Sequence, residues 1–352
     1  MTYRKILFKV LLVAFLFCPA ALAIAQHESG EEEKFNPGTF ILDHIGDAYE
    51  WHILTWNGHH VSIPLPVILY SKQSGFHVFM SSSFHHGSHE GFSIAADGVH
   101  KGKIVEQTTD ERPLLDLSIT KNVLAILVSM AIILWVFLSV AKAYKSRSNL
   151  PPKGLQSWVE PVILFVRDDI ARPSIGHKYK RFMPYLLTLF FFILVNNLMG
   201  LIPFFPFGAN VTGNIAITLV LALFTFFITL FSTNKNYWMH IVNAPGVPWW
   251  LKSPILPLMP FIELTGVITK PFVLMIRLFA NITAGHIIVM GFFSLIFIFG
   301  EMNVALGFGA SVISVLFTVF MFFLELLVAF IQAYVFTLLS ALYFGMAVEE
   351  PH

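Results

Sequence analysis

Charged side chains recur inside one long apolar stretch near the end of the chain. Glu263, Lys270 and Arg277 follow one another at intervals of seven residues, and Asn281 comes four residues after the arginine. Seven residues make nearly two helical turns, so these side chains would share one slowly drifting stripe. A charge near the centre of a bilayer costs at least about 2.5 kcal/mol, which makes such a residue a functional candidate. Glu263 and Lys270 could equally well be snorkelling residues, whose charged ends extend to the membrane surface, as functional ones. Snorkelling is a poor explanation for Arg277, because apolar residues surround it on both sides.

A histidine and a glutamate form a second candidate pair. In an antiparallel helical hairpin that turns near residue 305, His286 is level with Glu325, and Arg277 is level with Gln332. Arg277 and His286 are nine residues apart, which puts them on nearly opposite faces of a straight helix. We therefore expect Arg277 to face a partner, and His286 with Glu325 to line an aqueous route from outside. The alternative is a buried ion pair that only holds the helices together.

These side chains require a long hairpin. Residues 258–299 and 307–345 predict its two helices, and the apolar pattern is interrupted around residues 301–307. A helix of about 40 residues is about 60 Å long, twice the hydrocarbon thickness of a membrane. We therefore expect the two helices to be steeply tilted or kinked, as helices that lie along a curved partner would be.

Composition places most of the chain in lipid. Of the 352 residues, 56% are hydrophobic and only 12% are charged, and the mean hydropathy is +0.72. Soluble domains carry about 25% charged residues. The net charge of +1 offers no basic field for nucleic acid. Three further apolar regions, at 120–142, 182–202 and 212–232, predict an all-α polytopic membrane protein with about five spans in its membrane domain, 114–352.

The first 25 residues predict a cleaved signal peptide. Basic residues precede the short apolar run Val10 to Phe17, and Ala23-Ile24-Ala25 provides a small-residue cleavage pattern. A membrane anchor is the alternative, but a span needs about 20 apolar residues. The single cysteine, Cys18, lies inside this segment, which excludes an internal disulfide framework and a multi-cysteine metal site.

Residues 26–113 predict an exported, His-rich segment. Within it, Trp51 to Trp56 and Val61 to Tyr70 flank Asn57-Gly58, a pattern typical of a β-hairpin or a small three-stranded unit. The paired histidines, such as His59-His60, could bind a metal ion. Because no cysteine or acid stands at a recognised ligand spacing, we predict solvated loops and no metal site.

Charge asymmetry predicts the orientation in the membrane. The first span is followed by a basic cluster, and cytoplasmic loops are enriched in Lys and Arg; its members are Lys142, Lys145, Arg147 and Lys153. The exported segment would then lie outside, and after five crossings the C-terminus would lie in the cytoplasm. Residues 155–171 mix apolar with charged residues and predict an interfacial amphipathic helix.

The segment Arg277-Leu278-Phe279-Ala280-Asn281, followed by Ala284-Gly285-His286, resembles the signature of subunit a of F-type ATP synthases. Other blocks follow in the family's order: Asn197 to Pro203, Lys270-Pro271, and Gln332 to Phe336. The resemblance covers about residues 114–350 and leaves the His-rich segment outside. In many bacterial members the position of His286 is Glu and that of Glu325 is His, so this chain resembles the family with the pair exchanged.

The resemblance implies a proton-translocating stator subunit, not catalytic alone and without a cofactor. Its implied partners are a ring of c subunits, the b-subunit peripheral stalk, other ATP synthase subunits and lipid, in a bacterial inner membrane with the N-terminal segment periplasmic. Two offset half-channels would feed the ring, and Arg277 would act as its electrostatic gate. The implied proton pathway contains His286, Glu325, Gln332, Asn281, Glu263 and Ser340, with Lys270 and Asn197 in secondary roles.

Other function classes fit the sequence less well. A secondary transporter would also place charges in mid-membrane, but it usually shows inverted repeats, and this sequence has no such symmetry. An intramembrane enzyme would need a nucleophile with a base or a metal motif, and none of the HExxH or GxSxG type is present.

Overall fold

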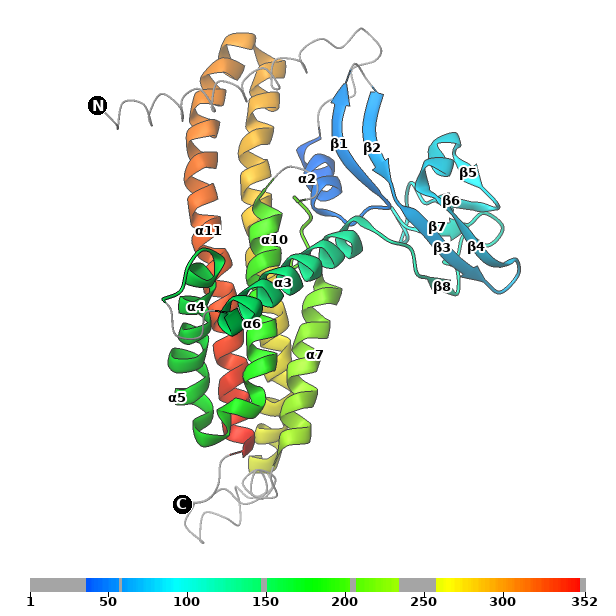
Figure 1. Ribbon diagram of the computed structural model, residues 1–352. Coiled ribbons are helices and arrows are strands. Elements are labelled where there is room, and N and C mark those ends of the chain that lie inside the picture. Colours follow the sequence, from blue (N-terminus) through cyan, green and yellow to red (C-terminus); the bar gives the residue numbers. More distant parts are fainter. Residues whose placement is uncertain (1–35, 57–58, 147–150, 203–206, 234–257, 349–352) are drawn as a thin grey trace. The chain divides into compact units, whose positions relative to one another are not determined.

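The structure is a computed structural model that describes residues 36–56, 59–146, 151–202, 207–233 and 258–348. The predicted signal peptide lies outside these residues, and so do the last four residues of the chain. Residues Pro37–His352 form one compact unit. Its described part contains a mainly helical portion and a smaller portion of short β-sheets (Figure 1).

Within the described residues, five helical stretches are long and apolar enough to cross a membrane, in agreement with the predicted number. Their main helices are α3 (Lys121–Ser146), α6 (Tyr179–Leu201), α7 (Ile215–Ser232), α10 (Leu258–Met302) and α11 (Val304–Val348). Each one satisfies its own backbone hydrogen bonds, as lipid requires. Aromatic side chains fill much of the space between them; Phe182 of α6, for example, stacks on Phe344 of α11 at 4.8 Å between ring centroids.

Helices α10 and α11 form the predicted hairpin, and each has 45 residues (Figure 1). The connection is shorter than predicted, because Asn303 alone separates the two helices. Its side-chain oxygen accepts a hydrogen bond of 2.8 Å from the backbone N–H of Ala305, so Asn303 caps α11 and the helix begins at once. Close approach also needs glycine here, since a Cβ on Gly307 would lie 2.8 Å from the Cα of Gly300.

The predicted interfacial helix is present, and protein covers part of its apolar side. It comprises α4 (Leu155–Phe165) and a π-helical turn, η2 (Val166–Ala171), and it continues through α5 (Arg172–Ile175) and a 3-10 turn, η3 (Gly176–Lys178), into α6. Val166 and Ile170 are fully buried in the core shared by the long helices. The amphipathic pattern therefore indicated the helix correctly, but packing on other helices, and not lipid alone, covers this apolar side.

The exported segment begins with a short helix, α2 (Pro37–Ile45), and a hairpin. Strands β1 (Glu50–Trp56) and β2 (His59–Pro64) pair antiparallel around Asn57-Gly58, as predicted. The second strand-like region, Val61 to Tyr70, contributes to two strands. The chain leaves β2 at Pro64 and starts β3 (Pro66–Ser71) two residues later, because Pro64 and Pro66 lack the N–H groups that a continuous strand would donate.

Two three-stranded sheets form the rest of this segment, whereas the sequence predicted at most one small three-stranded unit. Strand β3 lies between β4 (Gly75–Met80) and β8 (Leu115–Asp116), and a 3-10 turn, η1 (Ser81–His86), leads to the second sheet, of β5 (Ser88–His89), β6 (Phe92–Ile94) and β7 (Ile104–Glu106). The core of the two sheets contains Val67, Leu69, Phe84, Phe92 and Ile104.

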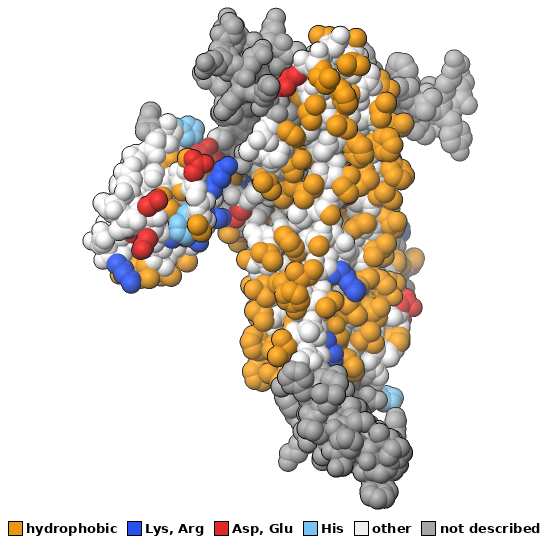
Figure 2. Space-filling model, turned by 180° about the vertical axis from the view of Figure 1, so that it is seen from behind, with side chains coloured by type: hydrophobic (Ala, Val, Ile, Leu, Met, Phe, Trp, Pro, Cys, Tyr) orange, Lys and Arg blue, Asp and Glu red, His pale blue; other side chains and the backbone are white. Residues whose placement is uncertain are grey.

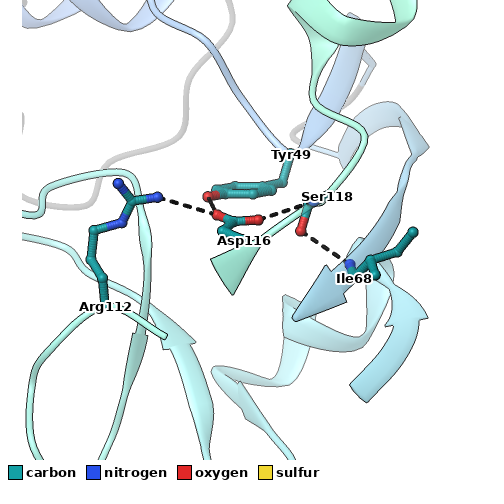
Figure 3. Close-up of polar contacts among 5 residues, drawn as sticks. All are labelled: Tyr49, Ile68, Arg112, Asp116 and Ser118. Atoms are coloured by element: carbon teal, nitrogen blue, oxygen red, sulfur yellow. Dashed lines mark hydrogen bonds and ion pairs between the residues drawn. The ribbon is translucent and has the colours of Figure 1, made fainter. Parts of the chain in front are cut away.

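A buried polar cluster ties the start of this segment to its end (Figure 3). The Tyr49 hydroxyl donates to Asp116, which also accepts from Arg112 and from the backbone N–H of Ser118. The Ser118 hydroxyl accepts from the N–H of Ile68, on β3. Burial and the neighbouring carboxylate of Asp116 raise the pKa of Tyr49 well above its ordinary value, so the phenol stays neutral.

Candidate functional site

The register of the α10–α11 hairpin brings His286 and Glu325 together. The rings of Phe292 and Phe317 stack at 5.1 Å, which fixes the level of the two helices between the turn and the site. His286 Nδ1 lies 3.8 Å from Glu325 Oε1, and both side chains are largely buried. The same register sets Gln332 level with Arg277. The depth relationships that the sequence predicted are therefore those of the structure.

His286 and Glu325 line a cavity between α6, α10 and α11. Besides these two side chains, the polar lining comes from Asn197 of α6 and Asn281 of α10, and apolar residues such as Ile282 complete the walls. Glu325 Oε1 is buried and makes no hydrogen bond within the part of the chain that the structure describes. The cavity thus combines an imidazole and a carboxyl group, which can exchange protons with water, and two amides, which can hydrogen-bond to water.

Asn197, in the wall of this cavity, links three parts of the chain by hydrogen bonds. It is buried, its amide donates to the carbonyl of Ala329 on α11 at 3.3 Å, and its side-chain oxygen accepts from the Thr212 hydroxyl at 2.6 Å. Thr212 belongs to the segment between α6 and α7, and the next residue, Gly213, accepts a hydrogen bond from Thr283 of α10. Sequence reasoning missed Thr212 and Thr283, because an isolated threonine in a membrane protein carries no signal of its own.

Arg277 lies on a different face of α10 from His286. It is exposed, whereas Leu274 and Leu278 on either side of it are buried in the helix core. Among the described residues, no hydrogen bond or ion pair is found for its guanidinium group, and Gln332, although level with it, is buried in the helix packing. Figure 2 shows basic side chains set in an otherwise hydrophobic surface of the helical portion. An uncompensated guanidinium on such a surface is costly unless an acidic partner covers it.

A second cavity lies between α7, α10 and α11. Its lining includes Lys270 and Tyr343, with the Lys270 ammonium 5.4 Å from the centre of the Tyr343 ring, and the hydroxyls of Thr225, Thr229 and Thr233. Most of the cavity wall is apolar, and these side chains bring a few polar groups to it.

Ser340 lies behind this second cavity and not in its wall. It is fully buried, donates to the carbonyl of Phe336, and lies 3.3 Å from the Thr225 hydroxyl, which in turn shares a hydrogen bond of 2.8 Å with the Tyr185 hydroxyl. Sequence reasoning selected Ser340 but missed Tyr185, Thr225 and Tyr343. The side chain of Glu263, the other candidate, lies outside the described residues.

Some histidines of the exported segment contact carboxylates. His77 contacts Glu90, and His85 contacts Glu50. Within the described ranges, no group of three or more His, Cys, Asp or Glu side chains is arranged to hold a metal ion.

Comparison with known proteins divides the chain at the start of α3. Residues 123–345 match the family model described as ATP synthase A chain, and residues 40–123 match one described as a domain of unknown function. "ATP synthase subunit a 2" of Chlorobaculum tepidum is 48% identical over 239 residues, which are 66% of this chain and 64% of that protein. "ATP synthase subunit a" of Chloroherpeton thalassium is 43% identical over 244 residues, 67% of this chain and 69% of that protein. "ATP synthase subunit a" of Anaeromyxobacter dehalogenans is 41% identical over 237 residues, which are 66% of this chain and 58% of that protein.

Proposed function

Because the chain belongs to the ATP synthase A chain family, we propose that it is the proton-conducting stator of the membrane sector, in which Arg277 gates a rotating ring of c subunits. The observation that carries the proposal is the exposure of Arg277 on an apolar helix surface, with buried Leu274 and Leu278 beside it. A partner with an acidic side chain at the same depth would remove the cost of that charge.

Arg277 suits the role of a fixed gate. A guanidinium group does not lose its proton in proteins, so it cannot carry protons itself. It favours the ionised form of any carboxyl group that comes to face it, and it thereby makes that group release its proton. The neighbouring exposed positions Ala280 and Ala284 are small, which allows a partner helix to approach closely.

The cavity around His286 and Glu325 is the proposed inlet from outside. Its imidazole and carboxyl group are 3.8 Å apart and can pass a proton between them through a small movement or one water molecule. Asn281 lines this cavity and is itself exposed four residues after Arg277. It therefore connects the inlet to the surface on which the ring would turn.

The cavity between α7, α10 and α11 is the proposed outlet to the cytoplasm. Its wall is mostly apolar, but it contains Lys270 and the threonine hydroxyls of α7, and Thr225 connects it by hydrogen bonds to the hydroxyls of Tyr185 and Ser340. Lys270 precedes Arg277 by two helical turns on α10, whereas His286 follows it, so the two cavities lie on opposite sides of the gate along the helix. Such an offset obliges a proton to travel on the ring between inlet and outlet.

The orientation and the assembly are part of the same proposal. The basic residues after α3 favour a cytoplasmic loop there, which places the exported segment outside and the C-terminus in the cytoplasm of a bacterium with the protein in its inner membrane. The proposed partners are the c ring at Arg277, the b-subunit peripheral stalk and the remaining synthase subunits.

The test is ATP-driven acidification of inverted membrane vesicles, with and without sodium, for the wild type and for Arg277→Ala. We expect acidification without sodium in the wild type and none in the variant, while the complex still assembles. Arg181→Ala is the matched control, because Arg181 is an exposed arginine at the start of α6, and it should pump normally. Normal pumping by Arg277→Ala would show that the gate is elsewhere and that the proposal is wrong.

A further inference from the structure

The sheet of β4, β3 and β8 has an apolar outward face. Side chains alternate between the two faces of a strand, and the register that pairs Tyr70 with both Phe76 and Leu115 places these three on one face. The exposed members of this face are each at least 42% exposed: Tyr70, Phe76, Val78, Met80, Leu115 and Leu117.

Half-buried apolar residues complete this outward face. The backbone N–H of Leu117 donates to the carbonyl of Ile68, and that of Ile119 donates to the carbonyl of Pro66, each at 2.9 Å. The pairing therefore continues beyond β8, so that Ile68, Pro66 and Ile119 lie between and beside the exposed residues. No charged side chain occurs on the outward face, and the Tyr70 hydroxyl is its one polar side-chain group.

The opposite face of the same sheet builds the core of the exported segment. Val67 and Leu69 are fully buried there and pack against Phe92 and Ile104 of the neighbouring sheet, which Figure 1 shows beside it. An antiparallel sheet with one face on a core normally presents polar side chains on the other. The outward face departs from that rule, and contiguous exposed apolar surface marks an interaction site.

The outward face ends where the chain reaches the membrane. Ile119 precedes the first residue of α3, Lys121, by two residues, a span of at most about 7 Å. The N–H of Lys121 donates to the carbonyl of Ala48 at 2.8 Å, so the joint between the sheet segment and the helix is hydrogen-bonded. Helix α3 has 26 residues and is about 39 Å long, which exceeds the hydrocarbon thickness and puts its first turn at the level of the lipid headgroups.

We propose that the outward face of the β4-β3-β8 sheet docks on the outer leaflet of the lipid bilayer beside α3. The face ends two residues before α3, whose first turns carry exposed apolar side chains such as Val123 and Leu127 that would lie in lipid. It carries no charges, and almost no hydrogen-bonding side chains, with which to select a protein partner. Removal of its apolar surface from water drives the docking, so the docking is insensitive to salt.

The experiment uses the full chain in lipid nanodiscs with a fluorophore on Val78→Cys, in a Cys18→Ser background. The matched control is Asp97→Cys, an exposed position of the same segment in the loop between β6 and β7. Lipids with a nitroxide just below the headgroup probe contact with the bilayer, and iodide probes contact with water. We expect nitroxide lipid to quench the label at 78 several-fold more than the label at 97, iodide to show the reverse, and high salt to change neither.

Three outcomes would overturn the proposal. Equal quenching of both labels by iodide, with none by the nitroxide lipid, would show that the face is in water. Protection of the label at 78 that arises only when the other synthase subunits are added would assign the face to a protein. If Val78→Cys disturbs the fold, judged by the trypsin resistance of the exported segment, Leu117→Cys repeats the test from β8, and its exposure to iodide would be equally decisive against lipid docking.

Discussion

Gly285 faces Glu325 across the α10–α11 hairpin, so closely that a Cβ added to Gly285 would lie 2.5 Å from the Glu325 carboxylate oxygen Oε1. A methyl group at the residue before His286 would force the Glu325 carboxyl group to shift from its place beside the imidazole. This relationship ties the family-like Ala284-Gly285-His286 segment to the geometry of the proposed inlet, and the effect of adding one methyl group can be measured.

Gly285→Ala should reduce ATP-driven proton pumping about tenfold or more, because the Glu325 side chain would have to move away from His286, and about 1.4 kcal/mol of lost interaction corresponds to a factor of ten. Pumping by inverted vesicles measures this. Gly291→Ala is the matched control on the same helix, since a Cβ there meets nothing within 4 Å. Equal effects of the two substitutions would mean that the carboxyl position at Glu325 is not what limits pumping.

His286→Glu should inhibit pumping strongly, because it would bring a second carboxylate next to Glu325, and like charges at this separation cannot both ionise. The double variant His286→Glu with Glu325→His restores one acid and one imidazole at the same depth. We expect it to recover most of the activity, which a double-mutant cycle on vesicle pumping would quantify. A double variant no better than His286→Glu would show that the two positions do not act as a pair.

Trp51→Ala should slow pumping although Trp51 belongs to the exported β1 strand. Its side chain is 4% exposed and packs with Ala125 of α3 and with Ala209 and Val211, the residues just before Thr212, which donates to Asn197 in the inlet. A cavity at this position would loosen that segment.

Trp51→Phe keeps an aromatic ring at this position and should pump faster than Trp51→Ala. The control is Ile53→Ala, which changes an exposed residue of the same strand and should have no effect. Pumping measured against the pH on the outside separates a change in the inlet from a general loss of folded protein. A lower rate with an unchanged pH profile would limit Trp51 to a role in stability.

The hairpin register and the exposed charge of Arg277 could be predicted from the sequence, because both follow from helical periodicity and from charges that lipid does not tolerate. His286 and Glu325 could be paired from the position of the turn alone. The sequence did not single out the hydroxyl groups of Tyr185 and Thr225, since each looks like any other residue of an apolar helix and meets its partner only across a helix interface. The sheet of β5, β6 and β7 was missed for a related reason: strands of two or three residues have no periodicity to read.

Alkaline pH should destabilise the exported segment through Tyr49. Burial and the Asp116 carboxylate raise the pKa of this phenol, so the folded state holds its proton where the unfolded chain, with an ordinary pKa of about 10, has released it. The stabilisation is therefore complete below about pH 10 and is lost as the pH rises towards the folded-state pKa, by up to about 1.4 kcal/mol per pH unit. Tyr49→Phe should lose about 1 kcal/mol at neutral pH, with its hydrogen bond, but should show a flatter decline above pH 10. Trypsin resistance of the segment in the full-length protein at pH 8 and pH 11 measures both effects, and Tyr70→Phe, at an exposed tyrosine, is the control; a decline as steep in Tyr49→Phe as in the wild type would assign the alkaline sensitivity to other groups.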